Sequence, residues 1–353
     1  MKVLFVYKYL TLGGVEAVLR ARLAGLEGLG IGAHAWFFHD YGGQPIFAGL
    51  EDRAHVGSVQ DCLRFAREGG FDLLCSIDTE EILPGLAGGP ERPRLVFECH
   101  SAYLENIEYL RELAGHPPAA VFTPSEGQRG LVRERLGPEI AVRVVPNPLR
   151  QEFVEEPVPF PSPPPRPVLA WIGRLDAQKN WEGFLELLGL LVRSGDPVEG
   201  WIIGKHVEND EKARFQKRAH DEHALGRLRW FGTLPSCRIH ILLDAVRDSG
   251  GVLVSTSRGE SFGLTVAEAM ARQCAVVVPN QAPFTEFVEE GVSGSLFQPG
   301  SPESAAGCVR GLLRDAERRR ACGRRGRQTI LARFAPEPAL AVLARELELA
   351  AAR

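Results

Sequence analysis

Short apolar runs alternate with stretches of helical periodicity along the first part of the chain. Apolar runs of strand length occupy residues 3–6, 33–38, 73–77, 95–98, 120–123 and 142–145, and helical periodicity covers residues 15–29 and 58–69. Strands that are apolar throughout are typical of a parallel sheet with helices on both faces. The pattern therefore predicts an α/β domain built on a mostly parallel sheet.

A proline-rich segment, PVPFPSPPPRP at residues 157–167, interrupts this pattern. Such a segment forms neither a helix nor a central strand and is extended and stiff. A second alternating series follows, with strands expected at residues 168–172, 200–203, 228–231, 251–255 and 275–279, and helices at residues 180–194 and 265–273. Its order resembles that of the first half without any sequence repeat, so the sequence predicts two domains of similar architecture.

The length of 353 residues also favours two domains. We expect a first domain at residues 1–156, a linker at 157–167, a second domain at 168–330 and a C-terminal helical segment at 331–353. The segment from residue 302 onward is helical by composition and includes an arginine-dense stretch at residues 314–327. A solvated helix face is the favoured interpretation of this stretch, and its low apolar content gives a peripheral membrane contact little support.

The composition is that of a globular protein, with 44% hydrophobic and 24% charged residues, and the formal net charge of −4 argues against a nucleic-acid partner. Residues 1–10 lack the features of a signal peptide and predict a buried strand. No apolar run reaches the roughly 20 residues that a bilayer requires. The 7 cysteines form no C-x-x-C pair, which disfavours disulfides and structural zinc and favours a reduced, cytoplasmic compartment.

The segment SRGESFGLTVAEAM at residues 257–270 offers the clearest candidate chemistry. It places Glu260 in a glycine-flanked loop and Glu268 about one turn into the next helix, where Glu268 could accept hydrogen bonds from ribose hydroxyls. The free amides at the start of that helix would suit a diphosphate. The residues expected to bind the donor there are Ser261, Phe262, Gly263 and Leu264. From spacing alone, a capped and solvated helix start explains the segment equally well.

This segment resembles the signature of the retaining glycosyltransferases of family four, which have the GT-B fold. Further motifs agree with the resemblance in order: GGVE at residues 13–16, VPN at 145–147, WIGRL at 171–175 with Lys179, WIIG at 201–204, FG at 231–232 and the stretch at 286–294. The resemblance spans nearly the whole chain and is strongest over residues 168–300. It implies two Rossmann-like domains facing across a cleft, with the acceptor on the first, the donor on the second and the terminal helix packing back toward the first.

The resemblance also implies a front-face transfer with retention from a nucleotide diphosphate sugar, most simply UDP- or GDP-linked, to an unidentified acceptor. Arg174 and Lys179 would place positive charge on the departing diphosphate, and His100, at the end of a buried strand, would hydrogen-bond the donor sugar. Glu260 would reach toward that sugar. The remaining candidate donor-binding residues are glycines that allow close backbone approach, namely Gly13, Gly14, Gly173 and Gly204.

We expect no metal and no other cofactor, because the chain has no Asp-x-Asp and the acidic cluster at residues 208–211 is more simply a solvated helix start. The sequence departs from the family pattern where Gln281 to Glu286 lacks the usual glycine pair, which leaves the shape of the sugar or acceptor pocket open. A nicotinamide dehydrogenase is disfavoured by the absence of G-x-G-x-x-G after the first strand. A non-catalytic binding or scaffold protein on the same fold and an inverting GT-B enzyme remain alternatives.

Overall fold

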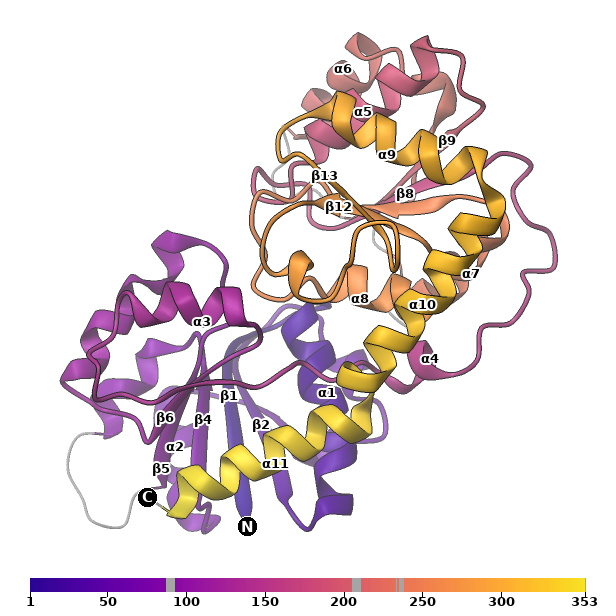
Figure 1. Ribbon diagram of the computed structural model, residues 1–353. Helices are drawn as coiled ribbons and strands as arrows, with labels where there is room; N and C mark the ends of the chain where they lie inside the picture. The colour runs from indigo at the N-terminus through magenta and orange to yellow at the C-terminus, as the bar shows by residue number, and fades with distance from the viewer. Residues whose placement is uncertain (87–92, 205–210, 233, 235–237, 353) are drawn as a thin grey trace. The chain divides into compact units, whose positions relative to one another are not determined.

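The computed structural model describes residues 1–86, 93–204, 211–232, 234 and 238–352 (Figure 1). Its internal contacts divide the chain into two compact units, which are described separately. Unit 1 consists of Met1–Gln151 and Arg333–Arg353, and unit 2 of Glu152–Ala332. The chain enters unit 2 within the short helix α4 (Gln151–Val154) and returns to unit 1 near the end of α10 (Ala316–Phe334).

Unit 1 contains, within its described residues, a seven-stranded sheet in the order β3-β2-β1-β4-β5-β6-β7, and each pair of neighbours is parallel. Its apolar strands are buried on both faces, as the sequence predicts. The strands are β1 (Lys2–Leu10), β2 (Gly32–Asp40), β3 (Ala54–Val56), β4 (Leu73–Ile77), β5 (Arg94–Glu98), β6 (Ala120–Thr123) and β7 (Val142–Val144).

Helices cover both faces of this sheet because successive strand side chains point to opposite faces. In β1, Val3 and Phe5 join a core with α1 and α11, whereas Leu4 and Val6 join a separate core with α2. The α-helices of unit 1 are α1 (Gly14–Leu26), α2 (Val59–Glu68), α3 (Glu126–Arg133) and α11 (Pro336–Ala352). Short 3-10 helices are η1 (Glu27–Leu29), η2 (Gln44–Phe47), η3 (Glu51–Arg53), η4 (Glu80–Leu86) and η5 (Leu104–Ala114).

The last helix, α11, packs on α1 within unit 1. Their approach is close at Gly25 of α1, where an added Cβ would lie 2.2 Å from Cδ1 of Leu340. Leu343 and Leu347 of α11 are also buried in the core that contains α1. The C-terminal segment is therefore part of the core of unit 1.

Unit 2 is a second parallel α/β layer structure, with a six-stranded sheet among its described residues in the order β10-β9-β8-β11-β12-β13. Its strands are β8 (Val168–Ile172), β9 (Glu199–Ile203), β10 (Leu228–Trp230), β11 (Val252–Val254), β12 (Val276–Pro279) and β13 (Ser295–Phe297). Its helices, apart from α4 and α10, are α5 (Trp181–Arg193), α6 (Glu211–Asp221), η6 (Leu225–Arg227), α7 (Ile239–Asp248), α8 (Leu264–Ala271), η8 (Phe284–Glu286) and α9 (Pro302–Arg314).

Both sheets follow the Rossmann strand order, in which the first strand lies between the second and the fourth. The order reverses between β1 and β4 in unit 1 and between β8 and β11 in unit 2. Ligands of open α/β sheets bind beyond the carboxyl ends of the strands at this point. The predicted fold class of two Rossmann-like domains is confirmed, and the two switch points are where candidate sites are expected.

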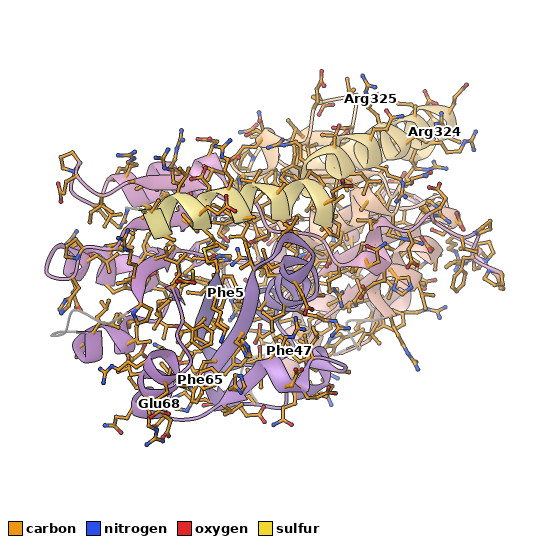
Figure 2. The ribbon with its side chains drawn as sticks, turned by 90° about the horizontal axis from the view of Figure 1, so that it is seen from below. Phe5, Phe47, Phe65, Glu68, Arg324 and Arg325 are labelled. Carbon is orange, nitrogen blue, oxygen red and sulfur yellow. The ribbon has the colours of Figure 1, made fainter. Side chains whose placement is uncertain are left out.

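The arginine-dense stretch is mostly exposed. Arg324 and Arg325 project outward from α10 (Figure 2). Arg327 differs, because it is buried and its guanidinium donates to the carbonyl oxygens of Ala271 and Val154. The stretch thus combines a solvated face with one structural arginine. Among the described residues, no helix is both long enough and apolar enough to cross a membrane.

Candidate functional site

The switch point of unit 2 carries a small pocket at the carboxyl ends of β8 and β11. The two strands are neighbours, and the pocket is closed on one side by the N-terminus of α8. Apolar residues at the strand ends and polar residues of the following loops both line it. Its lining residues are Trp171, Ile172, Leu253, Val254, Ser255, Ser257, Glu260, Gly263, Thr265 and Val266.

Lys179 and Glu260, which are far apart in the sequence, form an ion pair at this pocket. Lys179 Nζ lies 2.6 Å from Glu260 Oε1, and the side chains are 25% and 14% exposed. The hydroxyl of Ser257 donates to the same carboxylate oxygen at 2.8 Å. A cation and a carboxylate are thus held together at the position where an open α/β sheet binds its ligand.

The loops that carry this pair are fixed by polar contacts. The indole of Trp171 donates to Thr256 Oγ1 at 3.0 Å, and that hydroxyl donates to the carbonyl of Asn180 at 2.7 Å. Asn180 caps α5 from a left-handed conformation with φ of 54°, and its amide donates to the carbonyl of Thr256 at 3.0 Å. The loop after β8 and the loop after β11 are therefore tied together, which holds Lys179 close to Glu260.

Arg174 is placed differently from Lys179. Its side chain is 61% exposed, and its Nε lies 3.2 Å from Asp176 Oδ2. Asp176 also accepts from the main-chain N–H of Lys179 at 2.8 Å. The structure therefore brings Lys179 into contact with Glu260, while Arg174 lies in the same loop with an exposed guanidinium.

Three of the candidate glycines of unit 2 allow close backbone approach. A Cβ on Gly204 would lie 1.7 Å from the carbonyl oxygen of Gly173, and Gly173 itself donates to the carbonyl of Ile203 at 3.0 Å. Gly263 caps α8 with φ of 85°, a left-handed conformation that favours glycine, and a Cβ there would meet the ring of Phe284 at 2.8 Å. These positions shape the loops around the pocket.

The remaining donor-binding candidates lie on the approach to α8 and on α8 itself. Ser261 and Phe262 lead into Gly263, and Leu264 is the first residue of the helix. Phe262 is buried, and Glu268 is buried on α8 with 8% of its surface exposed. The start of α8 is thus close to Glu260 in the chain.

In unit 1, Gly13 caps α1 and Gly14 is its first residue. The carboxylate of Glu16 folds back over this turn and accepts from both the main-chain N–H and the hydroxyl of Thr11, at 2.6 and 2.5 Å. A Cβ on Gly13 would lie 2.6 Å from Glu16 Oε2. Burial raises the pKa of Glu16, although its hydrogen bonds to Thr11 oppose the shift.

His100 follows β5 and contacts a wholly buried ion pair. Its Nε2 lies 3.1 Å from Glu98 Oε2, and Arg22 Nη1 lies 2.9 and 2.8 Å from the two oxygens of the same carboxylate. Burial alone would raise the pKa of Glu98, but Arg22 and His100 hold it below its usual value. The main-chain N–H of His100 donates to both oxygens of Asp78, at 3.1 and 3.0 Å.

The sequence interpretation did not single out Glu98, Arg22 or Asp78. Glu98 follows three apolar residues at the end of β5, and Arg22 lies on the buried face of α1. A charged residue at a core position was therefore the sequence signal that could have identified them. The acidic cluster at residues 208–210 lies outside the described residues. Within the described ranges, no group of three or more His, Cys, Asp or Glu side chains is arranged to hold a metal ion.

Comparisons with known proteins agree with this architecture. Residues 154–329 match the family model described as glycosyl transferases group 1. A sucrose synthase of Acidithiobacillus caldus is 34% identical over 164 residues, which cover 44% of this chain and 21% of that protein. Sucrose synthase 2 of Oryza sativa is 30% identical over 150 residues, covering 40% of this chain and 19% of that protein. The matched segment spans about a fifth of the length of these relatives.

Solved structures match over nearly the whole chain. Anabaena Alr3699/HepE in complex with UDP and glucose has a TM-score of 0.84 and 18% identity, and the match covers 99% of both chains. Sucrose-phosphate synthase from Thermosynechococcus elongatus has a TM-score of 0.78 and 15% identity over 98% of both chains. At this identity the likeness shows the fold, which is GT-B. The family model and the relatives are those of glycosyl-transferring enzymes, so the non-catalytic alternative is not favoured.

Proposed function

We propose that the chain is a retaining glycosyltransferase of family four, because residues 154–329 match the family model described as glycosyl transferases group 1. It moves a sugar from a nucleotide diphosphate donor to an acceptor hydroxyl. Unit 2 binds the donor and unit 1 binds the acceptor. The observation that carries the proposal is the Lys179–Glu260 pair at the switch point of unit 2, at a pocket that the N-terminus of α8 also lines.

The charge that develops on the leaving diphosphate needs compensation, because electrostatic stabilisation of that charge supplies much of the rate enhancement in such transfers. Lys179 supplies a point charge, Arg174 is close in the chain with an exposed guanidinium, and the N-terminus of α8 adds about half a positive charge. We propose that these groups serve in place of a divalent cation. Transfer in excess EDTA at the untreated rate would support this, and activity that only added Mg²⁺ or Mn²⁺ restores would contradict it.

The mechanism that we propose is a front-face displacement. The bond between the anomeric carbon and the diphosphate oxygen breaks, the acceptor oxygen bonds to the same face, and the acceptor proton moves to the diphosphate. Glu260 positions the donor and is not a nucleophile, since its Oε1 already accepts from Lys179 and from Ser257. Isolation of a covalent glycosyl adduct on Glu260 would refute this assignment.

UDP-linked sugars are the first donors to test, because Alr3699/HepE is seen with UDP and with UDP-glucose. Thermal unfolding of the full chain with UDP, GDP, ADP, TDP or CDP ranks the bases, since a ligand at 100 times its dissociation constant stabilises by about 2.7 kcal/mol. Transfer or slow hydrolysis is then measured with sugars on the best base, and NMR of the product gives its anomeric configuration. Stabilisation by none of the five nucleotides, with no sugar turnover, would overturn the proposal, and an inverted product would overturn retention.

We also propose a cytoplasmic location. The described cysteines are free thiols, as in a reduced compartment. Fractionation of the source cells with an activity assay tests this, and recovery of the enzyme outside the cytoplasmic fraction would contradict it.

A further inference from the structure

The ion pair beneath His100 is costly to bury. The side chains of Glu98 and Arg22 are both 0% exposed. Moving each charge out of water costs several kcal/mol, and the attraction between the partners often only balances that cost. Two apolar residues of similar size would often stabilise unit 1 at least as much as the Arg22–Glu98 ion pair. We therefore look for a function of this ion pair other than stability.

The geometry of Arg22 is also unusual for a stabilising pair. Its Nη1 contacts both carboxylate oxygens, whereas its Nε and Nη2 are buried and have no hydrogen-bond partner among the residues that the structure describes. A guanidinium gains most from two parallel bonds that use its fork. Instead, Arg22 Cζ lies 5.3 Å from the ring centroid of Phe5, which is labelled on β1 in Figure 2. This arrangement leaves Glu98 Oε2 within 3.1 Å of His100 Nε2.

The contact with Glu98 determines which ring nitrogen of His100 carries the proton. An ionised carboxylate only accepts hydrogen bonds, and Arg22 keeps Glu98 ionised by holding its pKa below the usual value, so Nε2 must be the donor. In the neutral imidazole the lone pair then lies on Nδ1. Among the described residues Nδ1 has no hydrogen-bond partner, and 6% of the His100 side chain is exposed. His100 therefore offers an accepting nitrogen to a ligand.

The backbone of His100 is held as well. Its N–H donates to both oxygens of Asp78, whose own N–H donates to the carbonyl of Glu98 at 2.9 Å. Asp78 has φ of 40°, a left-handed conformation that costs an ordinary residue about 1 kcal/mol or more. The hydroxyl of Tyr109 donates to Asp78 Oδ1 at 2.7 Å and fixes this turn. The ring and the main chain of His100 thus have independent supports.

We propose that Glu98 is a positioning residue that, together with Arg22, holds His100 in the Nε2–H tautomer, so that Nδ1 accepts a hydrogen bond from a sugar hydroxyl. The identity of the ligand rests on the proposed function. The tautomer itself does not, and it can be measured in the protein without substrate.

The direct test is NMR of the full chain labelled with ¹⁵N-histidine, about two pH units above the ordinary histidine pKa of about 6.5. We expect His100 to show a pyrrole-type Nε2 and a pyridine-type Nδ1, with the assignment given by signals lost in His100→Gln. An Nδ1–H tautomer, or protons on both nitrogens at this pH, would overturn the proposal. This measurement does not depend on donor turnover, so a failure of the tautomer proposal can be distinguished from a failure of the proposed function.

The variant for function is the double substitution Arg22→Met/Glu98→Gln, which removes both charges and leaves no unpaired buried ion. We expect the NMR signals of His100 to become those of mixed tautomers and kcat to fall about 10- to 100-fold, with little change in KM for the donor. In a His100→Gln background the same double substitution should cause no further loss. An equal additional loss in that background would show a purely structural role and overturn the proposal.

A buried ion pair in unit 2 gives a matched control. Arg272 and Asp244 are 3% and 7% exposed and pair through their side chains. We expect Arg272→Met/Asp244→Asn to leave the His100 tautomer unchanged. If the tautomer changed in this control as much as in the Arg22→Met/Glu98→Gln variant, general loosening of the fold would explain the change. The contact with Glu98 would then not determine the tautomer of His100, and the proposal would be overturned.

Discussion

Replacement of Lys179 by alanine should lower kcat/KM far more than it lowers stability. At an effective dielectric constant of about 20, two unit charges about 4 Å apart interact by about 4 kcal/mol. Lys179 is 25% exposed, so solvent screens part of this energy. We expect a loss of about 2 to 4 kcal/mol of transition-state stabilisation, which is roughly a 30- to 1000-fold fall in kcat/KM.

The stability of the variant should change little, because a partly exposed ion pair contributes about 0 to 1 kcal/mol. The assay is the initial rate of nucleotide release over a range of donor concentrations, with thermal unfolding of each variant measured in parallel. Lys179→Arg keeps the charge and should retain more activity than Lys179→Ala. Arg193→Ala, which removes a cation paired with Glu222 at the other end of α5, is the matched control and should be nearly silent.

A folded Lys179→Ala protein with kcat/KM within about threefold of the parent would refute the assignment of Lys179 to the leaving group. Comparable losses in Lys179→Ala and Arg193→Ala would refute it too, since the effect would then be one of net charge. A large fall in melting temperature with unchanged kcat/KM would show that the pair with Glu260 is structural.

Three further outcomes are expected. Gly204→Ala should lower the free energy of unfolding in urea by more than about 2 kcal/mol, because the added Cβ meets the carbonyl of Gly173; a smaller loss would show that the loop moves easily. Glu268→Ala should weaken donor binding by about 1 to 3 kcal/mol in calorimetry through lost ribose hydrogen bonds, and unchanged binding would place the ribose elsewhere. His34 and His55 stack on each other, and burial lowers the pKa of both; the neighbouring His55 lowers that of His34 further. The folded state therefore binds fewer protons than the unfolded state. Stability falls as the pH drops through about 6.5 toward the folded pKa values. His55→Gln should flatten this dependence in urea titrations between pH 7 and 5, and an unchanged slope would contradict the assignment.

Most strands could be predicted from the sequence, including the three-residue strands β7, β10 and β11, which overlap the strands expected at residues 142–145, 228–231 and 251–255. The expected strands at residues 73–77, 120–123 and 168–172 coincide with β4, β6 and β8, because every position there is apolar or small and all but the half-buried Ile172 are buried. The strands β3 and β13 were missed, because neither stands out as an apolar run: β3 (AHV) contains a histidine and has no buried residue, and β13 (SLF) begins with a serine. Neighbouring strands supply the pairing that these segments do not specify alone.

The candidate residues of the site could be named from the sequence, whereas the contacts between them could not. Glu260 could be identified from its glycine-flanked loop, but its contact with Lys179 joins residues 81 positions apart. Arg22 and Glu98 are 76 positions apart, and only the parallel sheet and the packing of α1 bring them together. Local patterns fix where an element ends, whereas the pairing of side chains depends on topology.

The discontinuity of unit 1 has a consequence for biosynthesis. Leu19, Leu23 and Leu26 of α1 share their core with Leu340 and Leu343 of α11. At roughly 5 to 20 residues per second, a ribosome needs about 10 to 40 s to translate Glu152–Ala332 before α11 begins to appear. During this interval the nascent first unit presents an uncovered apolar stripe on α1. Such a stripe is a binding site for chaperones on the emerging chain, and unit 2, which is continuous in sequence, can reach its folded state before the unit that precedes it.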